Sequence, residues 1–169
     1  LFIAETGEYR IWKVDLAARG LDARSALASG DARARVIASN LPGFPDNLTR
    51  SADGRLWTGL TKPRAAAIDR MASKPWLRAV TLRLPKSLWP VPPTYGHAIA
   101  FDEDGRVVAD LQDPAGQLAE TSGVTEHGAR LYIHSLHAPA LGVLDARAAG
   151  LPPGGLPEDL ETVQGPAQQ

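Results

Sequence analysis

The stretch NLTRSADGRLWTGL, from Asn47 to Leu60, carries the pattern that decides the fold. Two short runs of alternating apolar residues flank the turn sequence Asp53-Gly54-Arg55. An Asp-Gly pair between such runs favours a tight β-hairpin, because the turn needs positive φ angles that Gly adopts freely and Asp tolerates better than most residues. We therefore predict a β-hairpin centred on Asp53 and Gly54.

The same plan recurs twice further along the chain. Residues 97–111 surround Asp104-Gly105, and residues 122–136 surround a turn at residues 127–129. Recurring short antiparallel hairpins are typical of a β-sandwich or a β-propeller, and composition does not choose between them. Three β-hairpins are thus expected.

The first residues resemble the second strand of the last hairpin. LFIAET at residues 1–6 matches LYIHSL at residues 131–136, and each is followed at similar spacing by another apolar run. If this repeat holds, the strand that pairs with residues 1–6 lies upstream of Leu1, and the sequence is a C-terminal piece with an incomplete first hairpin. The alternative is a chance similarity between β-branched runs.

Two regions depart from the strand pattern. Residues 64–84 carry apolar side chains at near-helical spacing, with Pro75 placed to begin a second helix, so one or two short amphipathic helices are expected. Residues 84–93 hold four prolines, too many for a paired strand, and are predicted to be an extended loop. The tail at residues 151–169 is rich in Pro, Gly and Gln and is predicted to be disordered.

Composition narrows the partners. The net charge of −1 over 169 residues provides no basic field for phosphates, so no nucleic-acid partner is expected. No apolar run approaches the roughly 18 residues that a membrane-spanning helix needs, and we expect no membrane contact from this segment. Zero cysteines exclude disulfides, thiolate zinc sites and cysteine nucleophiles within it.

Several separated motifs, in order, resemble the strictosidine synthase-like family. They are Leu41 to Asn47 with the following Asp53-Gly54 and Leu56-Trp57, Ala4-Glu5-Thr6 with Tyr9-Arg10-Ile11, the run from Pro90 to Gly96, and Val124 to His127 before Leu131-Tyr132. The resemblance covers roughly residues 1–144. It implies a six-bladed β-propeller related to paraoxonases and gluconolactonases, with a metal, usually calcium, on the central axis.

On this reading the chain is all-β, the C-terminal half of a six-bladed β-propeller with a short helical insertion. Residues 1–150 would hold about three blades, the first incomplete, and the missing N-terminal half would be their structural partner. The resemblance places Asp46 and Asn47 where relatives put oxygen ligands to the axial metal. Carboxylate and amide oxygens suit Ca²⁺, a hard ion that takes six to eight oxygen ligands. Without the resemblance, Pro-Asp-Asn is more often a plain turn.

The same resemblance locates an acid/base position on the final hairpin. Strictosidine synthases carry a glutamate there, and counting back from Glu126-His127 puts Ser122 at that position. Serine cannot serve as a carboxylate base near neutral pH, so Ser122 and its neighbour Thr121 are expected to contact a small-molecule substrate instead. Glu120 would share the face of Ser122 on a regular strand and could substitute only if the register or the strand path differs.

The four histidines are interpreted as surface or hydrogen-bonded structural residues. His134 and His137 lie three apart around a strand end and could bind a metal, although nothing else in the sequence supports that.

Three functions remain open from the sequence. The first is a calcium-dependent hydrolase acting on a lactone, ester or related small molecule, in which the metal polarises the carbonyl. The second is a non-catalytic propeller that serves as a binding platform. The third is a lyase that condenses an amine with an aldehyde, against which Ser122 counts. Whether the protein is an enzyme stays undecided at this stage, since fold alone does not give function.

Overall fold

The computed structural model describes residues 1–85, 89 and 93–152. Part of the predicted extended loop at residues 84–93 and nearly all of the predicted disordered tail therefore lie outside the described residues.

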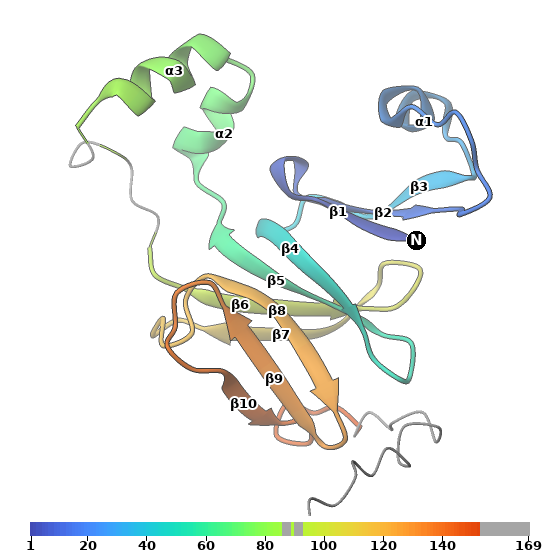
Figure 1. The fold of residues 1–169 in the computed structure, drawn as a ribbon, viewed down its shortest axis with the longest axis vertical. Helices are drawn as coiled ribbons and strands as arrows, with labels where there is room; N and C mark the ends of the chain where they lie inside the picture. Colours follow the sequence, from blue (N-terminus) through green and yellow to red (C-terminus); the bar gives the residue numbers. More distant parts are fainter. Residues whose placement is uncertain (86–88, 90–92, 153–169) are drawn as a thin grey trace, which may run out of the picture.

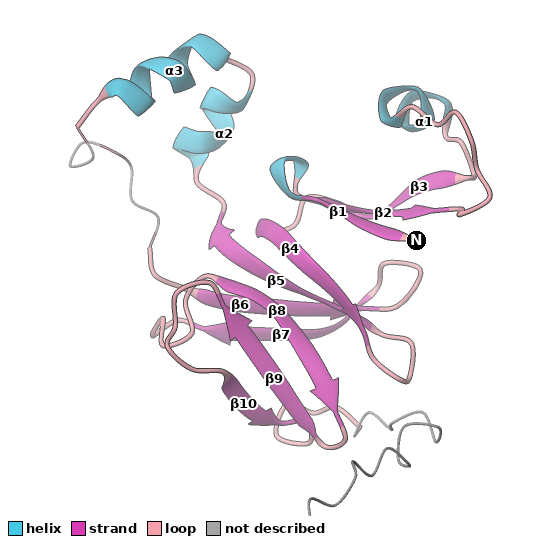
Figure 2. Ribbon diagram, in the orientation of Figure 1, coloured by secondary structure: helices cyan, strands magenta, loops and turns pink. Residues whose placement is uncertain are grey.

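Three antiparallel sheets make up the fold, with short helices between some of the strands (Figures 1 and 2). The first sheet has the strand order β1-β2-β3, the second β4-β5-β6-β7, and the third β10-β9-β8. The strands are β1 (Phe2–Glu5), β2 (Arg10–Val14), β3 (Ala34–Ala38), β4 (Gly43–Arg50), β5 (Leu56–Pro63), β6 (Gly96–Phe101), β7 (Val107–Asp113), β8 (Thr121–His127), β9 (Arg130–Ser135) and β10 (Gly142–Asp145).

All three predicted hairpins are confirmed. They are β4-β5, β6-β7 and β8-β9, each an antiparallel pair. The turn glycines Gly54, Gly105 and Gly128 have φ angles of +92°, +88° and +57°, the positive values that tight hairpin turns need. The first two hairpins join in the same four-stranded sheet, because β5 pairs with β6.

The two central strands of the second sheet, β5 and β6, are largely buried on both faces. Along β5, Leu56 and Leu60 pack toward the first sheet with Ile11, while Trp57 packs toward the third sheet with Val124. Successive residues of a strand point to opposite faces, so a strand covered on both sides is buried at consecutive positions rather than at alternate ones, as Leu56 to Leu60 are. The sheets stack face to face in chain order, as blades do in a β-propeller. The all-β propeller segment with a helical insertion is thus confirmed, and the number of blades in the whole protein stays a prediction.

The first sheet corresponds to part of the third. Strand β1 pairs with β2 as β9 pairs with β10, in agreement with the sequence similarity between residues 1–6 and 131–136. Strand β9 also pairs with β8 on its other edge, whereas within the described residues β1 has no strand on that side. Strand β3 and the helix α1 (Ala23–Ser29) were not predicted, because the apolar positions of each are too few to show a period.

The predicted helical insertion is also confirmed, as α2 (Ala66–Ala72) and α3 (Pro75–Arg83), with Pro75 in the first turn of α3. The hydroxyl of Tyr9, in the turn between β1 and β2, donates a hydrogen bond of 2.8 Å to Asp69 on α2. Arg64 lies 4.2 Å from the centroid of the Tyr9 ring and pairs with Asp69 at 3.0 Å. These contacts fix the base of the insertion to the first sheet. No helix in the described part of the chain has the length and apolar character needed to span a bilayer.

Candidate active site

Asp46 and Asn47 lie in a β-bulge of β4. Pro45 pairs with Leu60 and Leu48 pairs with Thr58, so two residues of β4 face one residue of β5 between those pairs. A bulge of this kind redirects side chains away from the regular alternation and is common beside functional sites. It leaves Asp46 partly exposed and Asn47 exposed in a strand whose neighbour β5 is buried.

The bulge packs closely against β8 of the third sheet. A Cβ atom at Gly59, opposite the bulge, would lie only 2.4 Å from backbone atoms of residues 121–123. A Cβ atom at Gly123 would lie 3.4 Å from the Cβ atom of Asn47. The hydroxyl of Thr49 donates to the carbonyl of Val124. Gly59 therefore allows β5 and β8 to approach to backbone contact, and Asn47 of β4 lies beside Gly123 of β8.

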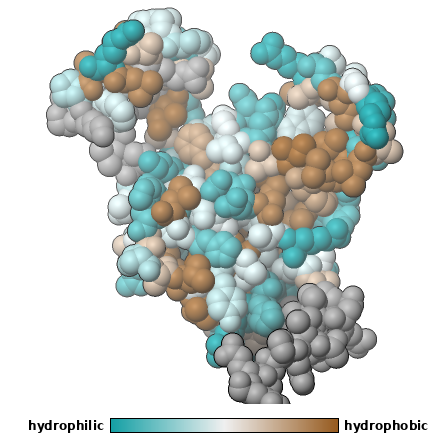
Figure 3. All heavy atoms as spheres, in the orientation of Figure 1, coloured by the Kyte–Doolittle hydropathy of each residue, from teal (hydrophilic) through white to brown (hydrophobic). Residues whose placement is uncertain are grey.

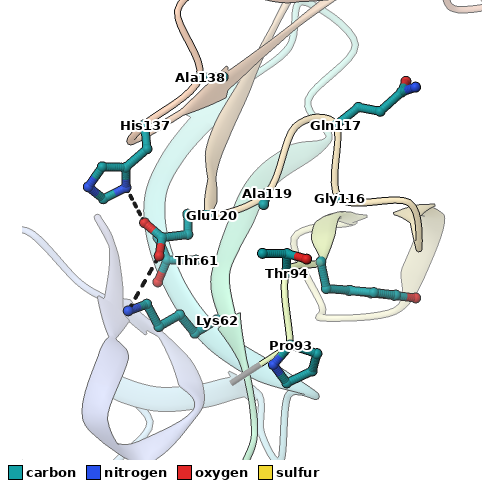
Figure 4. A pocket seen from close by; sticks show the side chains of 11 residues that line it. Thr61, Lys62, Pro93, Thr94, Gly116, Gln117, Ala119, Glu120, His137 and Ala138 are labelled. Atoms are coloured by element: carbon teal, nitrogen blue, oxygen red, sulfur yellow. Dashed lines mark ion pairs between the residues drawn. The ribbon is translucent and has the colours of Figure 1, made fainter. Parts of the chain in front are cut away.

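A cavity of about 450 Å³ opens between the second and third sheets, at the strand ends next to the helical insertion (Figure 4). It is lined by residues from the end of β5, from the loop before β6, from the β7–β8 loop and from the loop after β9. Glu120 reaches into it with Lys62 on one side and His137 on the other (Figure 4). The Nζ atom of Lys62 is 3.4 Å from one carboxylate oxygen of Glu120, and the Nδ1 atom of His137 contacts the other.

The path of β8 explains why Glu120 reaches this cavity. Its backbone has a φ angle of +56°, which residues with a side chain seldom adopt. In addition, the pairing with β9 shifts by one residue between Thr121 and Gly123. The regular alternation that would place Glu120 and Ser122 on the same face is therefore broken, and the substitution of Glu120 for the family's glutamate stays a prediction.

Thr121 and Ser122 are buried, with 2% and 5% of their surfaces exposed. The Thr121 hydroxyl donates to the carbonyl of Leu118 at 2.8 Å and accepts from the backbone N–H of His97 at 3.2 Å. Both functions of that hydroxyl are thus used within the scaffold. The substrate contact predicted for Thr121 and Ser122 stays a prediction, and their burial favours a role in holding β8 instead.

Glu126, part of one matched motif, is a buried structural carboxylate with 1% of its side chain exposed. One of its oxygens accepts hydrogen bonds from the Ser51 hydroxyl at 2.6 Å and the Trp57 indole at 3.1 Å, with Arg55 at 3.7 Å. Arg55 also donates to Asp53 at 2.6 Å, and this bond holds the pKa of Asp53 below its ordinary value. The cluster ties β8 to the β4–β5 turn, away from the cavity.

The donors present fit a calcium site in part. Asp46 offers a carboxylate that takes part in none of the ion pairs among the described residues, and Asn47 offers an amide oxygen. No group of three or more His, Cys, Asp or Glu side chains that could hold a metal occurs in the described part of the chain. These two residues would therefore supply a minority of the oxygens that Ca²⁺ requires. The pairing of His134 with His137 gains no support, because His134 contacts Thr125 at 3.1 Å while His137 contacts Glu120.

The sequence pattern missed Lys62 and the role of His137 in this cavity. Lys62 is 58 residues from Glu120 and has no motif around it, and His137 follows a strand end where histidines are usually structural. The pairing of β8 with β9 brings His137 to this carboxylate, and the packing of the second sheet on the third brings Lys62.

The stacked antiparallel sheets, with a cavity and a bulged edge strand, define a segment of a β-propeller with a candidate small-molecule site. Comparison with known proteins agrees. A scan against protein-family models finds no match, but the chain is 32% identical over 126 residues to the strictosidine synthase-like 10 protein of Arabidopsis thaliana, which is 70% of this chain and 34% of that protein.

Two animal relatives, both named adipocyte plasma membrane-associated protein, extend the comparison. The one from Salmo salar is 32% identical over 117 residues, or 65% of this chain and 28% of the relative. The one from Homo sapiens is 29% identical over 155 residues, or 88% of this chain and 35% of the relative. The chain belongs to the strictosidine synthase-like family, and it spans about a third of the length of the curated relatives it matches.

Proposed function

We propose that this chain forms part of a calcium-dependent hydrolase that acts on a lactone, an ester or a related small molecule. The observation that carries the proposal is the bulge at Asp46 and Asn47. It places one partly exposed carboxylate and one exposed amide beside the buried part of β5, and none of the ion pairs among the described residues uses that carboxylate. The bulged strand β4 also lies next to the 450 Å³ cavity. Thr61 lines the cavity, and the Thr61 hydroxyl donates a hydrogen bond to the carbonyl of Phe44 in β4.

The cavity suits a small molecule. Its volume lies within the range of ordinary ligand pockets, and its lining places polar side chains such as Lys62, Glu120 and His137 beside a few apolar ones. Asp46 and Asn47 would hold the calcium ion together with ligands from outside this chain. When bound, such an ion would polarise the substrate carbonyl and stabilise the oxyanion that develops during attack by water.

The test uses the full-length protein, of which this chain is a segment. We expect chelation of calcium to abolish hydrolysis of lactone and aryl ester substrates, and Asp46→Ala to weaken calcium binding at least tenfold with a matching loss of turnover. Asn47→Ala should weaken binding less, because a neutral amide oxygen contributes less than a charged one. Calorimetric titration with calcium, beside a hydrolysis assay, measures both quantities.

Ser122→Ala serves as the matched control, because Ser122 is buried in the neighbouring strand and offers no charge to an ion. Calcium binding should survive in that variant. Unchanged calcium binding in Asp46→Ala would remove Asp46 from the metal site and leave Pro45-Asp46-Asn47 as a structural bulge. Tight calcium binding without any turnover would favour the non-catalytic platform instead.

A further inference from the structure

Glu120 and His137 are held together by more than their own contact. The Ser135 hydroxyl donates a hydrogen bond of 2.6 Å to the carbonyl of Ala119 and accepts one of 3.3 Å from the backbone N–H of His137. The backbone N–H of Leu136 donates to the carbonyl of Glu120 at 3.1 Å. These bonds connect the segment at the start of β8 to the segment at the end of β9. They therefore fix the positions of Glu120 and His137 relative to each other.

The backbone of Glu120 is also held in an unfavourable conformation. A φ angle of +56° is unfavourable for a residue with a Cβ atom, and such conformations persist where the surrounding structure holds them, often at functional sites. The residue in this conformation is the one whose carboxylate lies between Lys62 and His137.

From this geometry we infer that His137 is the general base of the cavity and that Glu120 is the residue that positions its ring. The inference rests on the proposed hydrolase function and names the group that activates the attacking water. The Oε2 atom of Glu120 is buried and accepts no hydrogen bond from the described residues as they stand, and the Nδ1 atom of His137 lies against it. Because a carboxylate only accepts hydrogen bonds, a proton on Nδ1 would satisfy this oxygen. The lone pair of Nε2 is then left for another proton, as in other sites where a carboxylate orients a catalytic histidine.

The reaction is an ordinary ester hydrolysis. Nε2 of His137 takes a proton from a water molecule while the water oxygen forms a bond to the carbonyl carbon. The bond from that carbon to the leaving oxygen then breaks, and the protonated Nε2 gives its proton to the departing alkoxide. A lactone becomes a hydroxy acid and the histidine returns to its neutral form. Lys62 takes no part in the proton transfer, but it holds the second oxygen of Glu120 and so limits rotation of the carboxylate.

The tautomer of His137 tests the inference independently of any measurement of enzyme activity. In the full-length protein labelled with nitrogen-15 histidine, the His137 signal, assigned through His137→Asn, should show the proton on Nδ1. In Glu120→Gln the two tautomers should mix, because the amide can orient either its oxygen or its NH₂ group toward the ring. A wild-type His137 protonated on Nε2 would overturn the inference.

Kinetics give the second readout, with phenyl acetate and a six-membered lactone as the probes. General bases typically contribute 10²- to 10⁴-fold, so His137→Asn should lower kcat about a hundredfold or more with little change in KM. Glu120→Gln should lower kcat by about tenfold, again with little change in KM. His127→Asn, at the β8–β9 turn and outside the cavity, is the matched control and should keep wild-type kcat.

The two proposals fail in different ways. If the wild type hydrolyses the probes and His137→Asn remains within twofold of it, His137 is not the base, while the hydrolase function stands. If the wild type hydrolyses neither probe even with calcium bound, both the hydrolase function and the base assignment are overturned.

Discussion

Tyr9 joins the first sheet to the helical insertion through a single hydroxyl group. Its side chain is buried, and its hydroxyl donates to Asp69 at 2.8 Å. Burial, followed by the hydrogen bond to Asp69 and the charge of that carboxylate, raises the pKa of Tyr9 to about 12. The group is neutral when protonated, so the stability that this environment contributes is fully present below the ordinary value near pH 10. It is lost as the pH rises through the raised value.

We therefore expect the full-length protein to lose more stability between pH 9 and pH 12 than its Tyr9→Phe variant does. At pH 8 the variant should be less stable by about 1 kcal/mol, the usual net value of one hydrogen bond, with somewhat more possible because the acceptor is charged. Urea unfolding at several pH values measures both effects. Parallel pH profiles for the two proteins would show that Tyr9 does not titrate in this environment.

At the scale of elements, the approach of β5 to β8 depends on Gly59. A Cβ atom there would lie 2.4 Å from backbone atoms of three consecutive residues, and backbone cannot move aside as a flexible side chain can. The close approach also places Asn47 beside Gly123, so the same packing shapes the bulge proposed to bind calcium.

Gly59→Ala should destabilise the protein by about 1–3 kcal/mol, the usual cost of overpacking, and should weaken calcium binding as the strands separate. Gly7→Ala is the matched control, because a Cβ atom at Gly7 meets no atom within 4 Å and its φ angle is not positive. Thermal unfolding and calcium titration of both variants test the expectation. A Gly59→Ala protein as stable as the Gly7→Ala protein would contradict the close packing of β5 on β8.

At the scale of the whole molecule, the first sheet leaves apolar surface uncovered. Leu1 and Ile3 are 58% and 42% exposed, and hydrophobic residues gather over this sheet in the space-filling view (Figure 3). Within the described residues, β1 has a neighbouring strand on one edge only. An exposed strand edge with apolar side chains is a template for pairing with another chain.

The 169-residue chain expressed alone should therefore self-associate. Ile3→Lys should reduce that association, since a lysine on an edge strand opposes pairing, while Leu16→Lys, an equally apolar and 73% exposed position outside the strands, should change it little. Light scattering across a concentration series measures the effect. A monodisperse monomer at all concentrations would contradict the expectation.

Local patterns in the chain were enough to locate the three hairpins, the helical insertion and the family. The pairs Asp53-Gly54 and Asp104-Gly105 favour turns because their glycines adopt positive φ angles freely. Pro75 favours the beginning of α3, because its missing N–H costs nothing in the first turn of a helix. Each of these preferences acts within a few residues. The motif around Asp46 and Asn47 was also visible, although its bulge was not, because a bulge depends on the partner strand.

Tertiary structure alone decided which side chains meet in the cavity. Pairing of β8 with β9 brings Glu120 and His137 together, and the stacking of the second sheet on the third adds Lys62. Alternation along a regular strand placed Glu120 and Ser122 on one face, but a positive φ angle and a register shift redirect them. Such departures are stabilised by contacts with distant residues, among them the bond from Leu136 to Glu120, and the energy of those contacts is not written in the local sequence. The periodicity of apolar residues and the chemistry of the turns thus specify the strands. The site depends on how the strands pair and how the sheets pack.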